Sequence, residues 1–157
     1  MRELRDILKR LVDAERRMSG MVRSGTVHEV DPEKGTIRLI LGGTDDKPFL
    51  SPAIPYAQIG GALKLHSPPS KGQQMTIVGT GGDWRQSIAL PMTWSDSNPS
   101  PGSKGDEHVL TFGPWTVSLT GDALTIKGPK VFIDCGGSTF ELTGGGLKMV
   151  APDYDFQ

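Results

Sequence analysis

The stretch "ALTIKGPKVFIDCGGSTFELTGGGLKMV" occupies residues 123–150 and consists of four short pieces in which apolar and polar residues alternate. Alternation with a period of two predicts strands, and the Gly-Pro and Gly-Gly pairs between the pieces predict turns. Counted from Trp115, these breaks recur about every eight residues. Each piece has only two or three apolar side chains, so no piece can bury a face without neighbours.

A short repeat of strand and turn is typical of β-helices, in which each unit is stabilised by its neighbours. An eight-residue repeat is short for one turn of a single-chain β-helix. It fits better if three chains each supply one side of a prism. The sequence therefore predicts a triple-stranded β-helix, an intertwined homotrimer, as a shaft over residues 113–157. Ten apolar residues are its expected core on the three-fold axis: Val117, Leu119, Leu124, Ile126, Val131, Ile133, Phe140, Leu142, Leu147 and Met149.

Residues 21–94 also alternate with a period of two, between turn signals such as "DPEKG" at 31–35. Five or six short strands with Gly/Pro turns predict a small closed or nearly closed barrel. Strands are expected at 21–30, 36–41, 48–53, 61–66, 74–79 and 86–93, with a loop at "GGTDDKP". The expected core includes Val27, Val30, Ile37, Leu39, Ile77 and Ile88.

The N-terminal segment, residues 1–20, predicts a helix that Ser19 and Gly20 end. Its apolar residues are spaced 3, 4, 3 and 4 apart, as in the seam of a coiled coil, and are Leu4, Ile7, Leu11, Ala14 and Met18. Two interpretations remain open: a helix packed on its own domain, and a helix that self-associates. A linker is expected at 95–112, because "SDSNPSPGSKGDE" (95–107) contains no apolar residue.

The composition argues against several classes of function. The net charge of −1 gives no electrostatic reason to expect nucleic acid or an anionic membrane as a partner. The single cysteine, Cys135, excludes an intrachain disulfide, has no nearby His to activate it, and is expected to be a small buried hydrophobe. No apolar run approaches the ~20 residues of a membrane-spanning helix, and the charged start "MRELRDILKR" is not a signal peptide.

Motifs for catalysis are weak. "GTGGD" at 79–83 lacks the Gly-Lys-Ser/Thr of a phosphate loop and predicts a tight turn. The neighbouring carboxylates, Asp45/Asp46 and Asp106/Glu107, are expected to be solvated turn residues rather than a glycosidase pair. His28, His66 and His108 are widely separated in the sequence. The sequence therefore predicts no enzyme, no cofactor and no metal site.

Two segments carry a family resemblance: "MVRSGTVHEVDPEKGTIRLIL" (21–41) and "SPPSKGQQMTIVGTGGDWRQSIALPM" (67–92), followed by the Pro/Ser linker and the repetitive tail. In this order they resemble the phage baseplate assembly protein V family, the central spikes of contractile tails, tailocins and related injection systems. The resemblance implies a mainly β fold: a short N-terminal helix, an OB-fold-type barrel, and a C-terminal triple-stranded β-helix in a homotrimer. An alternative is an OB-fold module that binds nucleic acid or a glycan.

The resemblance also implies a membrane-piercing needle in the virion tail baseplate or injection particle, made in the bacterial cytoplasm. Its partners would be the tail hub, with the helix as candidate contact, and transiently the outer membrane of the target cell; no nucleic acid is expected. Members of the family often end in a His-x-His apex that encloses a metal ion. This sequence stops at "APDYDFQ" without such a pair, so an apex metal is expected only if further C-terminal residues follow.

Overall fold

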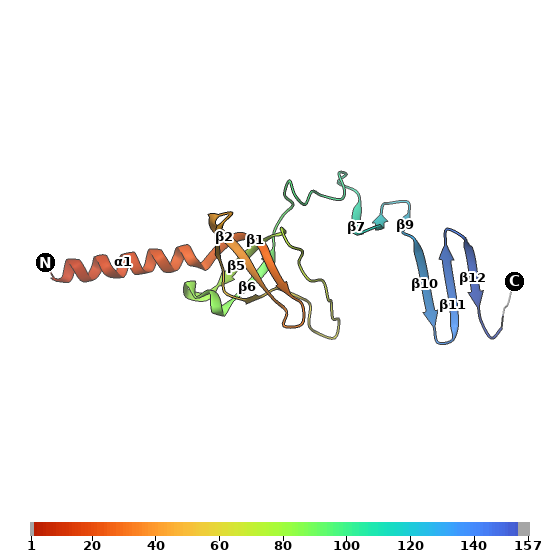
Figure 1. Ribbon diagram of the computed structural model, residues 1–157, viewed down its shortest axis with the longest axis horizontal. Helices are drawn as coiled ribbons and strands as arrows, with labels where there is room; N and C mark the ends of the chain where they lie inside the picture. Colours follow the sequence, from red (N-terminus) through yellow and green to blue (C-terminus); the bar gives the residue numbers. More distant parts are fainter. Residues whose placement is uncertain (1, 154–157) are drawn as a thin grey trace. The chain divides into compact units, whose positions relative to one another are not determined.

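The computed structural model describes residues 2–153 and is mainly β, with one N-terminal helix followed by antiparallel sheets, as predicted (Figure 1). The chain divides into two units, Met1–Pro99 and Ser100–Gln157. Each unit is described by itself below. The last four residues of the predicted shaft range lie outside the described residues.

Helix α1 (Arg2–Met21) continues directly into strand β1 (Val22–Asp31) (Figure 1). Ser19 and Gly20 do not end the helix as predicted, since it extends to Met21. At this end of the helix, the indole Nε1–H of Trp84 donates a hydrogen bond to the carbonyl oxygen of Gly20 at 3.0 Å and so satisfies a carbonyl of the last turn. This contact holds the last turn of the helix against the first unit.

A six-stranded antiparallel sheet forms the body of the first unit. Its strand order is β3-β2-β1-β5-β6, and β4 pairs with β2. Besides β1, its strands are β2 (Thr36–Thr44), β3 (Lys47–Leu50), β4 (Ile54–Pro55), β5 (Gln74–Gly79) and β6 (Ser87–Pro91). Tyr56, just after β4, bridges Ala89 of β6, so the sheet curls towards itself.

The core of the first unit lies on the inner side of this curled sheet. Its buried apolar residues are Val27, Ile37, Leu39, Leu41, Ile54, Tyr56, Met75, Ile77 and Ala89. Four of the six predicted core residues are therefore confirmed. Val30 is only partly buried, and Ile88 is 40% exposed. Ile88 was assigned to the wrong face: its neighbours Ser87 and Ala89 are the buried residues of β6, and alternation then turns Ile88 outward.

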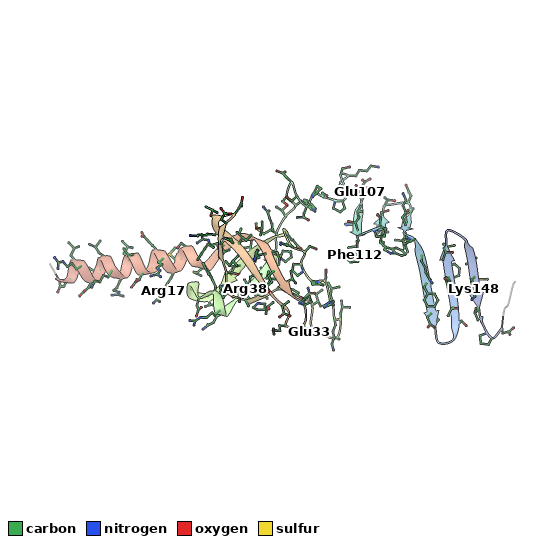
Figure 2. The ribbon with its side chains drawn as sticks, viewed as in Figure 1. Arg17, Glu33, Arg38, Glu107, Phe112 and Lys148 are labelled. Atoms are coloured by element: carbon green, nitrogen blue, oxygen red, sulfur yellow. The ribbon has the colours of Figure 1, made fainter. Side chains whose placement is uncertain are left out.

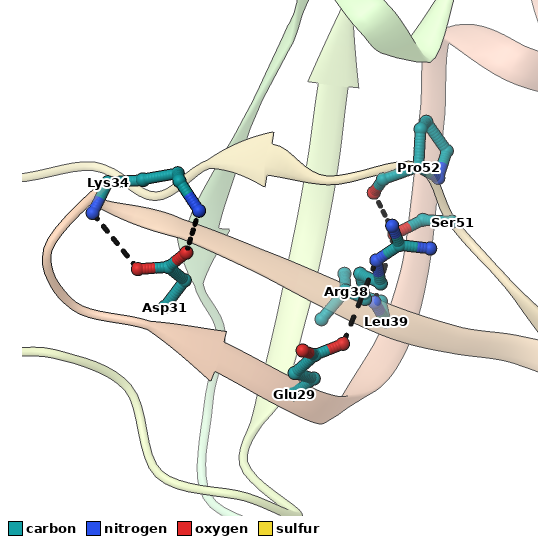
Figure 3. A network of polar contacts seen from close by, with 7 residues as sticks. All are labelled: Glu29, Asp31, Lys34, Arg38, Leu39, Ser51 and Pro52. Carbon is teal, nitrogen blue, oxygen red and sulfur yellow. Dashed lines mark hydrogen bonds and ion pairs between the residues drawn. The ribbon is translucent and has the colours of Figure 1, made fainter.

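The hairpin between β1 and β2 has the predicted "DPEKG" turn (Figure 3). A carboxylate oxygen of Asp31 accepts a hydrogen bond from the backbone N–H of Lys34 at 3.1 Å, and the other pairs with Lys34 Nζ at 2.8 Å. Further along, the hydroxyl of Ser51 accepts from Leu39 N–H at 2.9 Å and donates to the Pro52 carbonyl at 2.8 Å. The predicted strand 48–53 therefore ends early: β3 stops at Leu50, before Ser51, and β4 begins only at Ile54.

Two further expectations for the first unit are wrong. The predicted loop "GGTDDKP" is a tight hairpin, in which only Asp45 and Asp46 separate β2 from β3. Residues 61–66 do not form a strand: the segment is a loop closed by hydrogen bonds from Gly61 N to Leu63 O and from Leu65 N to Ile59 O. The alternating leucines of this loop have no strand to pair with, and both are exposed.

The second unit contains two three-stranded antiparallel meanders (Figure 1). The first comprises β7 (His108–Phe112), β8 (Trp115–Leu119) and β9 (Leu124–Lys127). The second comprises β10 (Lys130–Cys135), β11 (Ser138–Thr143) and β12 (Gly146–Val150). Strand β7 occupies the end of the range 95–112 that the sequence predicted as linker, because "HVLTF" pairs back on β8 through the Gly113-Pro114 turn.

The second unit has no hydrophobic core in the single chain. Among its described residues, 100–153, none is buried, whereas nine apolar residues are buried in the first unit. Extended chains with both faces open to water do not remain folded by backbone hydrogen bonds alone. The strands of this unit are therefore formed by a chain that buries none of its described apolar side chains by itself.

Candidate functional site

The sheet β10-β11-β12 has one apolar face. Residues directly opposite each other in an antiparallel sheet lie on the same face, and the register aligns Val131, Leu142 and Leu147 in one row. Two residues along, a second row on this face aligns Ile133, Phe140 and Met149. The six largest residues of this face therefore form a continuous apolar surface of two rows by three strands. Ile133, for example, is 51% exposed.

The sheet β7-β8-β9 repeats this arrangement. One row aligns Leu110, Val117 and Ile126, and the next pairs Leu119 with Leu124. At the other end of the same face, Phe112 lies opposite Trp115. Phe112 is 84% exposed, more than any other large apolar residue among those described (Figure 2). The other face carries smaller or polar residues, including Ser118 opposite Thr125 and Thr116 opposite Lys127.

All ten residues that the sequence predicted as trimer core lie on these two apolar faces, and none of the ten is buried within the chain. The prediction missed Leu110, Phe112 and Trp115, which lie on the same face. The signal was present in "HVLTFGPWTV", where apolar residues alternate on both sides of a Gly-Pro turn. Cys135, expected to be buried, is exposed in the single chain; its cross-strand partner is Ser138.

The opposite face of β10-β11-β12 is mostly charged or polar, with Phe132 and Val150 as its apolar residues. Lys130 Nζ and Glu141 Oε1 form an ion pair at 2.7 Å, and the same Nζ lies 5.5 Å from the ring centroid of Phe132. The hydrogen bond from Lys130 lowers the pKa of Glu141, and the charges of Lys130 and Lys148 act in the same direction. Lys148, on β12, is directly opposite Glu141 (Figure 2). Its charged residues are suited to contact with water, whereas the apolar face of the same sheet is suited to burial.

A third exposed apolar surface is the seam of helix α1, the stripe expected to contact the hub. All residues from 3 to 19 are exposed, including Leu4, Ile7, Leu11, Ala14 and Met18. The helix therefore does not pack its apolar stripe on its own unit, which was one of the two interpretations of its sequence. Together with the two sheet faces, this stripe makes three exposed apolar surfaces among the described residues.

Comparison with known proteins identifies a relative that is itself a spike. No family model matches the chain. The spike protein of Escherichia phage P2 is 29% identical over 128 residues, an alignment that covers 78% of this chain and 58% of the relative. This chain is a homologue of that phage spike protein. The resemblance predicted from the two sequence segments is thereby confirmed, and the chain spans a little over half of the relative's length.

The carboxylates considered for catalysis have local structural roles. Asp45 and Asp46 form the turn between β2 and β3. Glu107 Oε1 accepts hydrogen bonds from the backbone N–H groups of Ser103 at 2.8 Å and Lys104 at 2.9 Å, and these bonds lower the pKa of Glu107. Across the described residues, no group of three His, Cys, Asp or Glu side chains is arranged to hold a metal ion.

The "GTGGD" segment at 79–83 positions the helix. Its glycines Gly81 and Gly82 have φ of 65° and 78°, which favours glycine, and a Cβ on Gly82 would lie 2.8 Å from the carbonyl oxygen of Arg17. Close backbone contact with α1 thus explains the glycine, and the segment forms a turn, as predicted. Nearby, Trp84 packs edge-on against Phe49 at 6.0 Å, and the guanidinium of Arg23 lies 5.9 Å from the Trp84 ring.

An open cleft of about 780 Å³ lies beside this junction, with Arg16, Arg17 and Arg23 among its lining residues. Its arginines are accompanied by Asp13 and by Asp83, which pairs with Arg85 at 3.1 Å. The cleft is therefore lined by four arginines, two aspartates and the rings of Phe49 and Trp84, and the two aspartates offset only part of its positive charge. No helix within residues 2–153 combines the length and apolar character needed to cross a membrane.

Proposed function

We propose that this chain is the central spike of a contractile tail baseplate, a homotrimeric needle that pierces the target membrane. One observation carries the proposal: the second unit has regular strands and two apolar faces but no buried residue among its described residues. The homology to a phage spike protein supports the same conclusion from an independent direction. Two further copies of the chain would supply the missing apolar partners.

Three copies fit these faces because each sheet has one apolar and one polar side. In an intertwined β-helix, three such sheets turn their apolar faces to a common axis and their polar faces to water. Rows such as Ile133, Phe140 and Met149 would then stack along the axis as layers of the core. Ion pairs such as Lys130–Glu141 would lie on the solvent-facing outside of the shaft.

For the first unit, we propose an OB-fold-type barrel at the wide end of the spike. The bridge between Tyr56 and Ala89, together with the hydrogen bond from Ala57 N to Ala89 O at 2.9 Å, supports closure between β4 and β6. This end would dock on the tail hub, and the shaft would extend away from it. Contact with the outer membrane of the target cell would be transient and made by the shaft end.

The mechanism is mechanical rather than chemical. A shaft whose strands are hydrogen-bonded from chain to chain has few free edges and transmits axial load through those bonds. Its charged outer face keeps it soluble while the apolar side chains are held on the axis. Such a part needs no catalytic residue and no cofactor, and we propose none.

Localisation in the particle tests this function. Particles produced by the bacterium that encodes the chain are purified, labelled with an antibody against it, and imaged by electron microscopy. Label at the baseplate end of the tail is expected, together with loss of infection or killing when the chain is deleted and recovery when it is supplied again. Label along the tail tube or on the capsid, or full activity of the deletion particles, would contradict the proposal.

A further inference from the structure

Helix α1 carries an apolar stripe that its own unit leaves uncovered. Leu4, Ile7 and Leu11 are each more than half exposed, and the contacts that hold the helix are at its C-terminal end, at Arg17 and Gly20. A helix of this kind gains most of its stability from packing an apolar face, not from its propensity. The stripe therefore requires an occupant, and the pattern of residues on the helix indicates which one.

The stripe has the heptad pattern of a coiled coil, with positions labelled a to g. Position a is occupied by Leu4, Leu11 and Met18, and position d by Ile7, Ala14 and Met21. In parallel coiled coils, Leu at a combined with Ile at d favours three or four strands over two. The first two turns of the helix have this combination, which matches the three copies that the sheet faces of the second unit require.

The charges beside the stripe favour a parallel, in-register arrangement. Arg10 is at position g, and Glu15 is at position e of the following heptad. In a parallel coiled coil the g residue of one helix faces this e residue of its neighbour, so Arg10 would pair with Glu15 of the next copy around the trimer. Complementary g and e residues set both the partner and its orientation. A helix that bound only an unrelated hub surface would not need charges that pair with those of a second copy of the same helix.

We infer that α1 associates with the α1 helices of two further copies of this chain as a parallel three-stranded coiled coil. This inference rests on the proposed homotrimer and specifies how its N-terminal end is closed. On this inference, the apolar seam of the helix forms the contacts among the three copies, in place of the hub contact expected from the sequence. A hub contact would then use the outside of the coil, where Val12 lies at position b.

Cysteine cross-linking tests the inference on the full chain. Cys135→Ser removes the native thiol, and Arg10→Cys with Glu15→Cys places a pair of thiols where neighbouring helices are expected to meet. Because each helix would contact two neighbours, mild oxidation of this double variant should yield covalent trimers on a denaturing, non-reducing gel. The matched control, Lys9→Cys with Arg16→Cys on the outer f positions, should remain monomeric on the same gel. All four positions are exposed in the single chain.

The outcomes separate this inference from the proposed function. Light scattering on the unoxidised samples measures the mass in solution: a monomer would contradict both the trimer and the coil. A trimer in which Arg10→Cys with Glu15→Cys fails to cross-link would overturn the coil alone.

Charge exchange gives a second readout without cysteines. Arg10→Glu should lower the melting temperature of the helical circular dichroism signal, and adding Glu15→Arg should restore it; no recovery would contradict the pairing.

Discussion

Ile133 on β10 lies directly opposite Phe140 on β11, and both side chains are on the same solvent-facing side of the sheet. Met149 on β12 completes the row. Three apolar side chains are thus aligned across three strands, and none of them is buried within the chain. Burial of such side chains is worth roughly 1.5–3 kcal/mol each, and this stabilisation becomes available only when the row meets other copies.

Substitution of this row should prevent assembly. Phe140→Asp would place three carboxylates together at the axis of the trimer, and a buried unpaired charge costs about 3–5 kcal/mol. We expect loss of the trimer at micromolar concentration, measured by analytical ultracentrifugation. Thr143→Asp, on the same strand but opposite Lys130 on the polar face, is the matched control and should assemble normally. A trimer with Phe140→Asp would show that this face is not the axis.

The link between the two sheets of the second unit depends on Gly128. A Cβ on this residue would overlap the indole ring of Trp115, whereas nothing lies within 4 Å of the Cβ position of Gly121. We therefore expect Gly128→Ala to destabilise the shaft by about 1–3 kcal/mol, the usual cost of overpacking. Gly121→Ala should be neutral or slightly stabilising. Thermal unfolding followed by circular dichroism compares the two; equal melting temperatures would mean that the ring does not rest on Gly128.

The polar face should give the shaft a defined dependence on pH. The pKa of Glu141 is lowered in the folded chain by the hydrogen bond from Lys130. Its stabilising contribution is therefore complete above the ordinary glutamate pKa of about 4.3 and is lost as the pH falls through the lowered value. Wild type should melt higher than Glu141→Gln at pH 6, and the difference should shrink below pH 4. A difference that grows with acid would contradict the direction of this shift.

Single-stranded nucleic acid should not be a ligand, although some barrels of the proposed type bind it. The net charge of the chain is −1, and Asp13 and Asp83 offset two of the four arginines that line the cleft beside Trp84. In a fluorescence anisotropy titration with labelled single-stranded DNA at low salt, we expect no saturable binding up to tens of micromolar protein. Saturable binding that weakens steeply with added salt would favour the nucleic-acid-binding alternative.

Much of this fold could be predicted because the sequence patterns that specify its helix and strands are local. Alternation and Gly-rich turns in residues 123–150 predicted β9 to β12, and the 3-4 spacing of apolar residues predicted α1. The assignment of ten apolar residues to one side of the shaft also followed from alternation, since period two determines which residues share a face. The register now groups them into two apolar faces.

The errors concern features that depend on distant contacts. The helix ends one residue after Gly20, where Trp84, far along the chain, caps the Gly20 carbonyl. The predicted strand 48–53 ends at Leu50, where the Ser51 hydroxyl bonds to Leu39 N–H on a neighbouring strand. In 61–66, alternating leucines imitate a strand, but the pair Gly60-Gly61 allows a closed loop instead. Local pattern alone contains no information about these partners.

The central claim is that the second unit folds by association of three copies. Size-exclusion chromatography with multi-angle light scattering on the purified full chain measures this most directly. The account predicts one species with three times the 16.9 kDa mass of the chain, stable to dilution, whose β signal is lost together with the trimer on heating. A monodisperse monomer with full β content would contradict it.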